Sequence, residues 1–121
     1  MEPEEAILAF SALAQPTRLD VFRLLVRHEP DGLPAGEIAR HLAVPHNTLS
    51  SHLAILSRAG LIEAKRHSRS IVYRARLEAV TALAAYLVRD CCAGRPEVCA
   101  PLVAELGPCC EPARGTAGEL V

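Results

Sequence analysis

Apolar residues recur at helical spacing from the start of the chain to Gly60 and predict successive helices. The predicted ranges are 4–14, 16–28, 34–44 and 45–59. Prolines stand at the start of the last three, where a first-turn proline is tolerated, and Gly60 follows the final one as a natural C-terminal cap. The last two helices are short and joined by a tight turn, which is typical of a helix-turn-helix.

After Gly60 the pattern changes to two short runs rich in Ile, Val and Tyr, at 61–66 and 70–75. They predict a β-hairpin with a basic tip at 67–69. A helix-turn-helix followed at once by such a ribbon predicts a winged helix-turn-helix, so the expected fold class is mainly α (α+β) with one antiparallel hairpin wing. In this fold the second short helix enters the major groove of DNA, and the wing reaches the adjacent backbone or minor groove.

The segment 77–92 predicts a further helix with almost no charge through its middle. A helix that is apolar nearly all round needs a second surface to cover it, and the simplest cover is the same helix of another subunit. We therefore expect a homodimer formed through this helix and the helix at 4–14. Twofold symmetry would place two recognition helices about 34 Å apart, which is one turn of DNA.

Composition limits the setting of this fold. With 121 residues the chain holds one ordinary domain, and no apolar run approaches the length of a membrane span. We expect a DNA-binding and dimerisation domain over 1–92 and a cysteine-containing, partly mobile extension over 93–121. The five cysteines are an odd number and no signal-like segment opens the chain, so a soluble cytoplasmic protein with reduced thiols is expected.

The net charge of −1 conceals a basic middle, because six Lys or Arg residues stand against Glu63 alone between Arg58 and Arg76. Such a segment is often an ordinary solvated face, but beside a helix-turn-helix it indicates contact with phosphates. Short polar groups on the second helix are suited to base edges. The candidate DNA-binding residues are His46, Asn47, Ser50, Ser51, His52, Arg58, Lys65, Arg66 and Arg69.

Three cysteines, Cys91, Cys92 and Cys99, form the candidate ligand site. Gly94 and Pro96 between them favour a turn that brings the third sulfur over the first two. Three thiolates with no imidazole or carboxylate at usual ligand spacing suit a soft, thiophilic centre. The plainer interpretation is that each is a small buried hydrophobe. A second pair, Cys109 and Cys110, is interpreted as part of a nonfunctional tail.

Three segments of the chain resemble the ArsR/SmtB family of metalloregulatory repressors: AQPTRL at 14–19, NTLSSHLAILSRAGLI at 47–62 and RHSRSIVY at 66–73. The resemblance spans about 6–90. It implies a dimeric repressor, not an enzyme and with no organic cofactor, that binds operator DNA and releases it when its inducer binds. Two family sensor sites are absent, since 36–40 has no cysteine and 77–90 has no histidine.

The cysteine triplet instead resembles the arsenic-responsive branch of the family, which binds trivalent arsenic, as arsenite or an organoarsenical, or antimony through three C-terminal thiolates. Pro45 and Gln15 depart from the family's usual Ser and Asp, so both helix starts are expected to lack a side-chain acceptor. Two alternatives stay open. One is a thiol-redox regulator, because Arg89 and Arg95 would stabilise neighbouring thiolates. The other, less supported, is a small thiol-dependent arsenate reductase.

Overall fold

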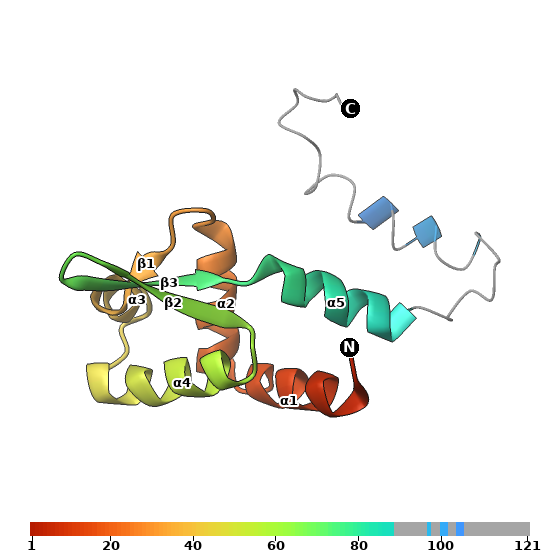
Figure 1. The fold of residues 1–121 in the computed structure, drawn as a ribbon, viewed down its shortest axis with the longest axis horizontal. Coiled ribbons are helices and arrows are strands. Elements are labelled where there is room, and N and C mark those ends of the chain that lie inside the picture. Colours follow the sequence, from red (N-terminus) through yellow and green to blue (C-terminus); the bar gives the residue numbers. More distant parts are fainter. Residues whose placement is uncertain (89–96, 98–99, 102–103, 106–121) are drawn as a thin grey trace, which may run out of the picture. The chain divides into compact units, whose positions relative to one another are not determined.

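A computed structural model of the chain describes residues 1–88, 97, 100–101 and 104–105. It divides into two compact units, Met1–Tyr86 and Leu87–Val121. The helices are α1 (Pro3–Leu13), α2 (Pro16–Arg27), α3 (Ala35–Leu42), α4 (His46–Arg58) and α5 (Leu77–Val88), and the strands are β1 (Leu33–Pro34), β2 (Ile62–His67) and β3 (Ser70–Ala75). This is the predicted winged helix-turn-helix, with a small antiparallel sheet (Figure 1).

The sheet has the strand order β1-β3-β2 and includes one strand that the sequence pattern did not predict. β2 and β3 form the wing, in which Lys65 pairs with Val72. β1 pairs with the other edge of β3, with Pro34 opposite Val72. Pro34 ends this strand and is also the N-cap of α3, so the helix predicted to open at Pro34 begins one residue later.

Gly32 allows β1 to approach β3. Its φ of +74° is a conformation that side chains rarely adopt, and a Cβ at this position would lie 2.4 Å from the carbonyl oxygen of Tyr73. The close passage of the chain here places α3 against the sheet. β3 therefore lies between β1, which leads into α3, and β2, which follows α4, so both edges of β3 pair with strands next to the helix-turn-helix.

Aliphatic side chains from every helix meet in one core. The largest fully buried ones are Leu25, Ile38, Leu49, Leu56, Leu61 and Val21. Each such side chain stabilises the fold by roughly 1.5–3 kcal/mol relative to exposure. The buried residues of α1 are three alanines, Ala6, Ala9 and Ala12, and Leu13 packs against the core while partly buried. Among the described residues no polar or charged side chain is fully buried.

The two helix starts that lacked the usual capping residue behave differently. Pro45 precedes α4 without any side-chain cap, as predicted. At α2 the prediction is wrong: Oε1 of Gln15 accepts a hydrogen bond of 2.8 Å from the backbone N–H of Arg18. The longer side chain of Gln reaches the amide that a shorter Asp would have served.

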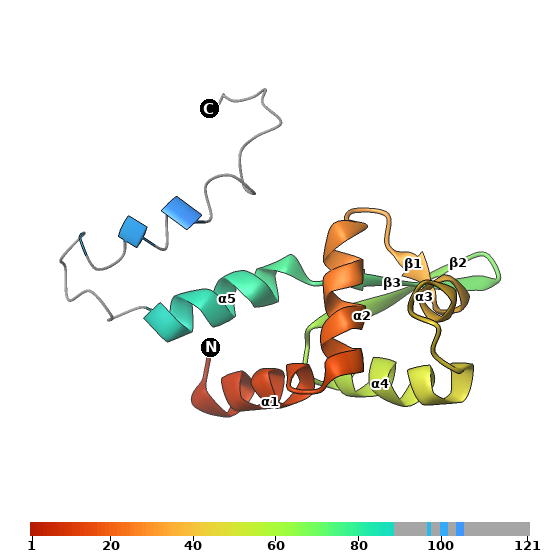
Figure 2. The ribbon, with the colours of Figure 1, turned by 180° about the vertical axis from the view of Figure 1, so that it is seen from behind.

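Apolar side chains remain exposed on α1 and α5. Ile7 is 67% exposed and Leu8 48%, while Leu77 and Val80 on α5 are 43% and 39% exposed. No helix within the described ranges has the length and apolar character needed to cross a bilayer. In both Figure 1 and Figure 2, α1 and α5 lie at the end of the domain opposite the wing.

Candidate nucleic-acid interface

α4 separates its apolar and polar residues onto different faces. Leu49, Leu53 and Leu56 are buried in the core. The exposed residues in its first half are His46, Asn47, Thr48, Ser50 and Ser51. They include four of the predicted DNA-binding residues and present hydroxyl, amide and imidazole groups that donate to and accept from base edges.

The start of α4 has no N-cap side chain, so the backbone N–H groups of His46 and Asn47 lack a side-chain acceptor. Pro45 is in an extended conformation with φ −61° and ψ 147°, and its ring has no acceptor. Nearby, the N–H of Thr48 donates to Oδ1 of Asn47 at 2.9 Å. Free N–H groups and the positive end of the helix dipole both attract phosphate. Pro45 therefore leaves this end of α4 open to an anion.

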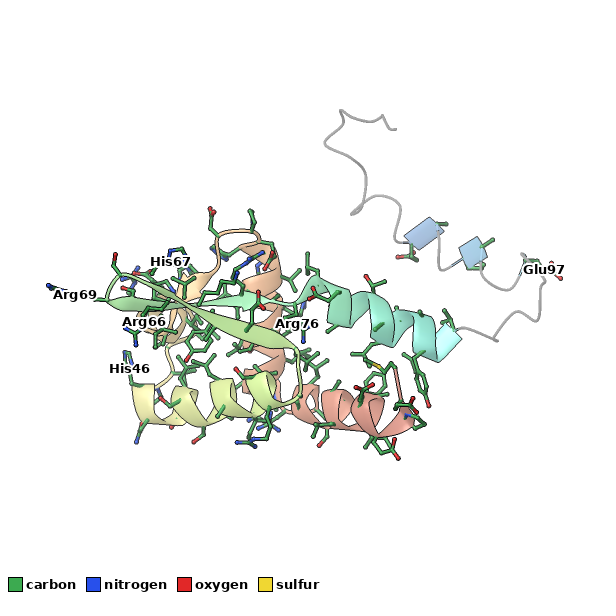
Figure 3. The ribbon with its side chains drawn as sticks, in the orientation of Figure 1. His46, Arg66, His67, Arg69, Arg76 and Glu97 are labelled. Atoms are coloured by element: carbon green, nitrogen blue, oxygen red, sulfur yellow. The ribbon has the colours of Figure 1, made fainter. Side chains whose placement is uncertain are left out.

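Lys65, Arg66 and Arg69 on the wing are exposed, and none of them forms an ion pair with any residue that the structure describes. Figure 3 shows Arg66 and Arg69 at the same end of the domain as His46 at the start of α4. The wing cations and the open helix start thus form one positively charged surface, which we call the α4–wing surface. It consists of His46, Asn47, Ser50, Ser51, Lys65, Arg66 and Arg69.

The other arginines of the basic segment are used elsewhere. Arg74 donates to Glu29 at 3.0 Å, and this hydrogen bond and charge raise the pKa of Arg74 above its ordinary value. Arg76 pairs with Glu78 at 3.1 Å and donates to the carbonyl oxygen of Gly60. Both guanidinium groups hold the C-terminal end of β3 to neighbouring segments, and each has an acidic partner.

Arg58, another predicted DNA-binding residue, lies away from the α4–wing surface. It is the last residue of α4, about 18 Å along the helix from His46 at 1.5 Å per residue. Its side chain lines a cavity of about 400 Å³ that is also bordered by Glu5 of α1 and Arg76. The structure therefore does not bring Arg58 together with the wing cations.

His52, also a candidate, is half-buried on the side of α4 that faces α2. Its Nδ1 lies 3.4 Å from Nη1 of Arg18, and Nε of Arg18 donates to the carbonyl oxygen of Ala12 at 2.6 Å. Sequence reasoning did not identify Arg18, because the contact joins residues 34 positions apart and leaves no local periodicity. Arg18 thus links the end of α1 to the recognition helix.

The predicted thiol site, Cys91, Cys92 and Cys99, lies outside the described residues, as do Cys109 and Cys110. In the part of the chain that the structure covers, no group of three or more His, Cys, Asp or Glu residues is arranged to hold a metal ion. The candidate inducer site therefore stays a prediction from the sequence.

Comparison with known proteins supports this geometry. The helix-turn-helix domain family matches residues 13–64. The chain is 33% identical over 89 residues to the HTH-type transcriptional regulator YgaV of Escherichia coli, covering 74% of this chain and 88% of that protein. It is 30% identical over 88 residues to the transcriptional activator HlyU of Vibrio cholerae, covering 73% and 79% respectively.

Solved structures give the same result. An ArsR-like transcriptional regulator from Rhodococcus sp. RHA1 superposes with a TM-score of 0.66 at 26% identity, over 90% of this chain and 95% of that one. The transcriptional repressor BigR from Xylella fastidiosa gives 0.56 at 28%, over 70% and 86%. A homodimeric winged helix-turn-helix domain from Mycobacterium bovis gives 0.56 at 26%, over 71% and 84%. The first four of these proteins are described as regulators of transcription and the Mycobacterium bovis protein as a possible one, and none is described as an enzyme.

Proposed function

We propose that this chain, which belongs to the ArsR family of winged helix-turn-helix transcriptional regulators, represses an arsenic-resistance operon and leaves its operator when trivalent arsenic or antimony binds Cys91, Cys92 and Cys99. The relatives include both repressors and activators of transcription, since BigR is described as a repressor and HlyU as an activator. For this chain we propose repression.

The observation that carries DNA binding is the α4–wing surface. Its wing cations have no acidic partner among the described residues, and the adjacent α4 start offers free N–H groups. Phosphate contacts supply most of the affinity and fix the register, while Ser50, Ser51 and His46 contact base edges. Arg58, about 18 Å along α4 from His46, and His52, which contacts Arg18, are not part of this proposed contact.

A homodimer places two such surfaces on one operator. α1 and α5 expose the apolar side chains Ile7, Leu8, Leu77 and Val80, which a twofold partner would cover. The Mycobacterium bovis relative is described as a homodimer, which supports the same assembly here. Dimer geometry then decides whether both recognition helices reach successive major grooves.

The inducer follows from the thiol chemistry of the chain. Soft trivalent arsenic and antimony suit thiolate ligands, and three thiolates would satisfy one such ion. The site needs reduced cysteines, so we place this activity in the cytoplasm, where thiols are kept reduced. Ligand binding just beyond α5 would alter the dimer contact and weaken DNA binding. A coupling of about 1–3 kcal/mol lowers operator affinity roughly 5–150-fold, without refolding.

Fluorescence anisotropy tests this function on a duplex selected from random sequences by the reduced protein. Arsenite should release the wild type, whereas Cys91→Ser, Cys92→Ser or Cys99→Ser should hold the duplex. The double change Cys109→Ser/Cys110→Ser is the matched control and should respond as the wild type does. A response that survives replacement of all three proposed ligands would refute the arsenic site while leaving DNA binding intact.

The redox alternative is separated in the same assay. Peroxide without metalloid should leave the complex intact if the thiols serve as arsenic ligands. Release by peroxide, reversed by dithiothreitol, would instead identify Cys91 or Cys92 as half of a redox pair with Cys99. A monosubstituted arsenical adds a further comparison, because two thiols suffice to bind it and Cys99→Ser would then keep its response.

A further inference from the structure

Two histidine rings meet where α2 and α3 end, on a part of the domain that the proposed function does not use. His28 is the residue that caps the C-terminus of α2, and His41 lies in the last turn of α3. Their ring centroids are 5.7 Å apart with the planes at 72°. His28 is half-buried and His41 is exposed, so solvent reaches the pair.

Hydrogen bonds to the backbone fix the same tautomer in both rings. Nδ1 of His28 lies 3.0 Å from the carbonyl oxygen of Leu24, and Nδ1 of His41 lies 2.9 Å from that of Glu37. A carbonyl oxygen can only accept, so Nδ1 carries the hydrogen in each ring. The Nε2 atom of each neutral ring therefore keeps its lone pair. Metal-binding histidines commonly have this arrangement, with the second ring nitrogen donating to a carbonyl or carboxylate.

The separation of the rings suits one shared ion. With metal–nitrogen distances of about 2.0–2.1 Å, two imidazoles bound to one ion at a tetrahedral angle have centroids about 5 Å apart. The observed 5.7 Å differs from this by less than an ångström. A shared ion would therefore require the two ring centroids to approach by less than an ångström.

The electrostatics of the site also favour a cation. Both rings lie at helix C-termini, where the helix dipole is negative. Arg40, next to His41 in the sequence, is a positive charge that would repel a metal ion, but it is paired with Glu37. Arg27, next to His28, is also positive and is exposed to solvent. Within the described residues no third His, Cys, Asp or Glu completes the set, so water would occupy the other positions. Two imidazoles and water are suited to Ni²⁺, Cu²⁺ or Zn²⁺.

We propose that Nε2 of His28 and Nε2 of His41 bind one divalent transition-metal ion, which joins the end of α2 to the end of α3. The site shares no residue with the cysteine triplet, and its failure would leave the proposed function unaffected. Because both ligands are in place only in the folded domain, the ion stabilises the native state, and the stabilisation grows with the logarithm of the ion concentration once this exceeds the Kd.

Titration of the reduced full-length protein with Ni²⁺ tests the site. The His28→Gln and His41→Gln variants should each lose at least tenfold in affinity, the lower end of what loss of even an outer hydrogen-bond partner costs at metal sites. His67→Gln, on the exposed wing, is the matched control and should bind as the wild type does. A second background in which all five cysteines are serine removes binding by thiols.

A measurement on the unaltered protein guards against variants that fold poorly. Paramagnetic Ni²⁺ should broaden the ring resonances of His28 and His41 before those of His46 and His67. Equal broadening of all the histidines, or equal affinity in the His28→Gln and His67→Gln proteins, would overturn the site. Binding that disappears in the cysteine-free background would do so as well, because it would assign the ion to thiolates alone.

Discussion

The guanidinium of Arg18 lies 3.4 Å from Nδ1 of His52, and this contact joins the start of α2 to the middle of the recognition helix. The same side chain donates to the carbonyl oxygen of Ala12 at the end of α1. One residue therefore touches a helix with an exposed apolar face and the helix that carries the proposed DNA-contacting residues. A change in the position of α1 would reach α4 through Arg18 without passing through the wing.

Replacement of Arg18 should weaken both folding and DNA binding. Arg18→Ala removes a charged donor from the Ala12 carbonyl, and hydrogen bonds to charged groups contribute about 1.5–3 kcal/mol. Urea unfolding should show a loss in this range, and anisotropy should show weaker operator binding. Arg23→Ala, an exposed arginine on the same helix, is the control and should change neither quantity. Normal operator affinity in Arg18→Ala would contradict the role of Arg18 in holding α4.

The unpaired wing cations should determine the salt dependence of DNA binding. Arg66→Ala or Arg69→Ala should each weaken binding to all duplex sequences and reduce the slope of log K against log salt by about 0.9 for each lost phosphate contact. Arg76→Ala is the matched control, since Arg76 is paired with Glu78 and should leave the slope unchanged. Equal slopes for all three variants would remove the wing from the interface.

The conformation of Gly32 should make it intolerant of any side chain. Gly32→Ala places a Cβ 2.4 Å from the Tyr73 carbonyl oxygen at a φ of +74°, and a strained conformation of this kind costs about 1–3 kcal/mol. Gly36→Ala is the control, because the nearest atom to its Cβ would be Cε1 of His46 at 3.9 Å, an ordinary contact. That change should be neutral or stabilise by about 0.4–1 kcal/mol. Thermal unfolding of the two variants measures the difference.

The uncapped start of α4 gives a prediction about stability. Pro45→Ser supplies an N-cap oxygen worth about 0.5–2 kcal/mol, but it also loses the proline's restriction of the unfolded chain, about 0.4–1 kcal/mol. Pro45→Ala loses that restriction and gains no oxygen. The serine variant should therefore exceed the alanine variant by about 1 kcal/mol in urea unfolding. Equal stabilities would show that the Asn47 side chain, which already accepts from the N–H of Thr48, makes an N-cap oxygen redundant.

Most of the elements could be predicted because their signals are local. Periodicity of 3.6 residues locates the helices, and runs of Ile, Val and Tyr locate β2 and β3. β1 was missed because it has two residues, one of them proline, and is held only by pairing with β3. Likewise, composition treats all the arginines of the basic segment alike. Only the fold shows that Arg74 forms an ion pair with Glu29, while Arg66 has no acidic partner among the described residues.

The strand order β1-β3-β2 leaves β2 as an outer strand of the sheet. An unprotected outer strand can pair with another molecule and start aggregation, and charged side chains are a common defence. On β2 the exposed charges are Lys65 and Arg66, the same residues that we assign to phosphate contact. Neutralising both would remove solubility protection together with DNA affinity. If such a variant shows no DNA binding, sedimentation distinguishes the two causes: aggregates indicate lost solubility, and an unchanged oligomeric state indicates lost DNA affinity.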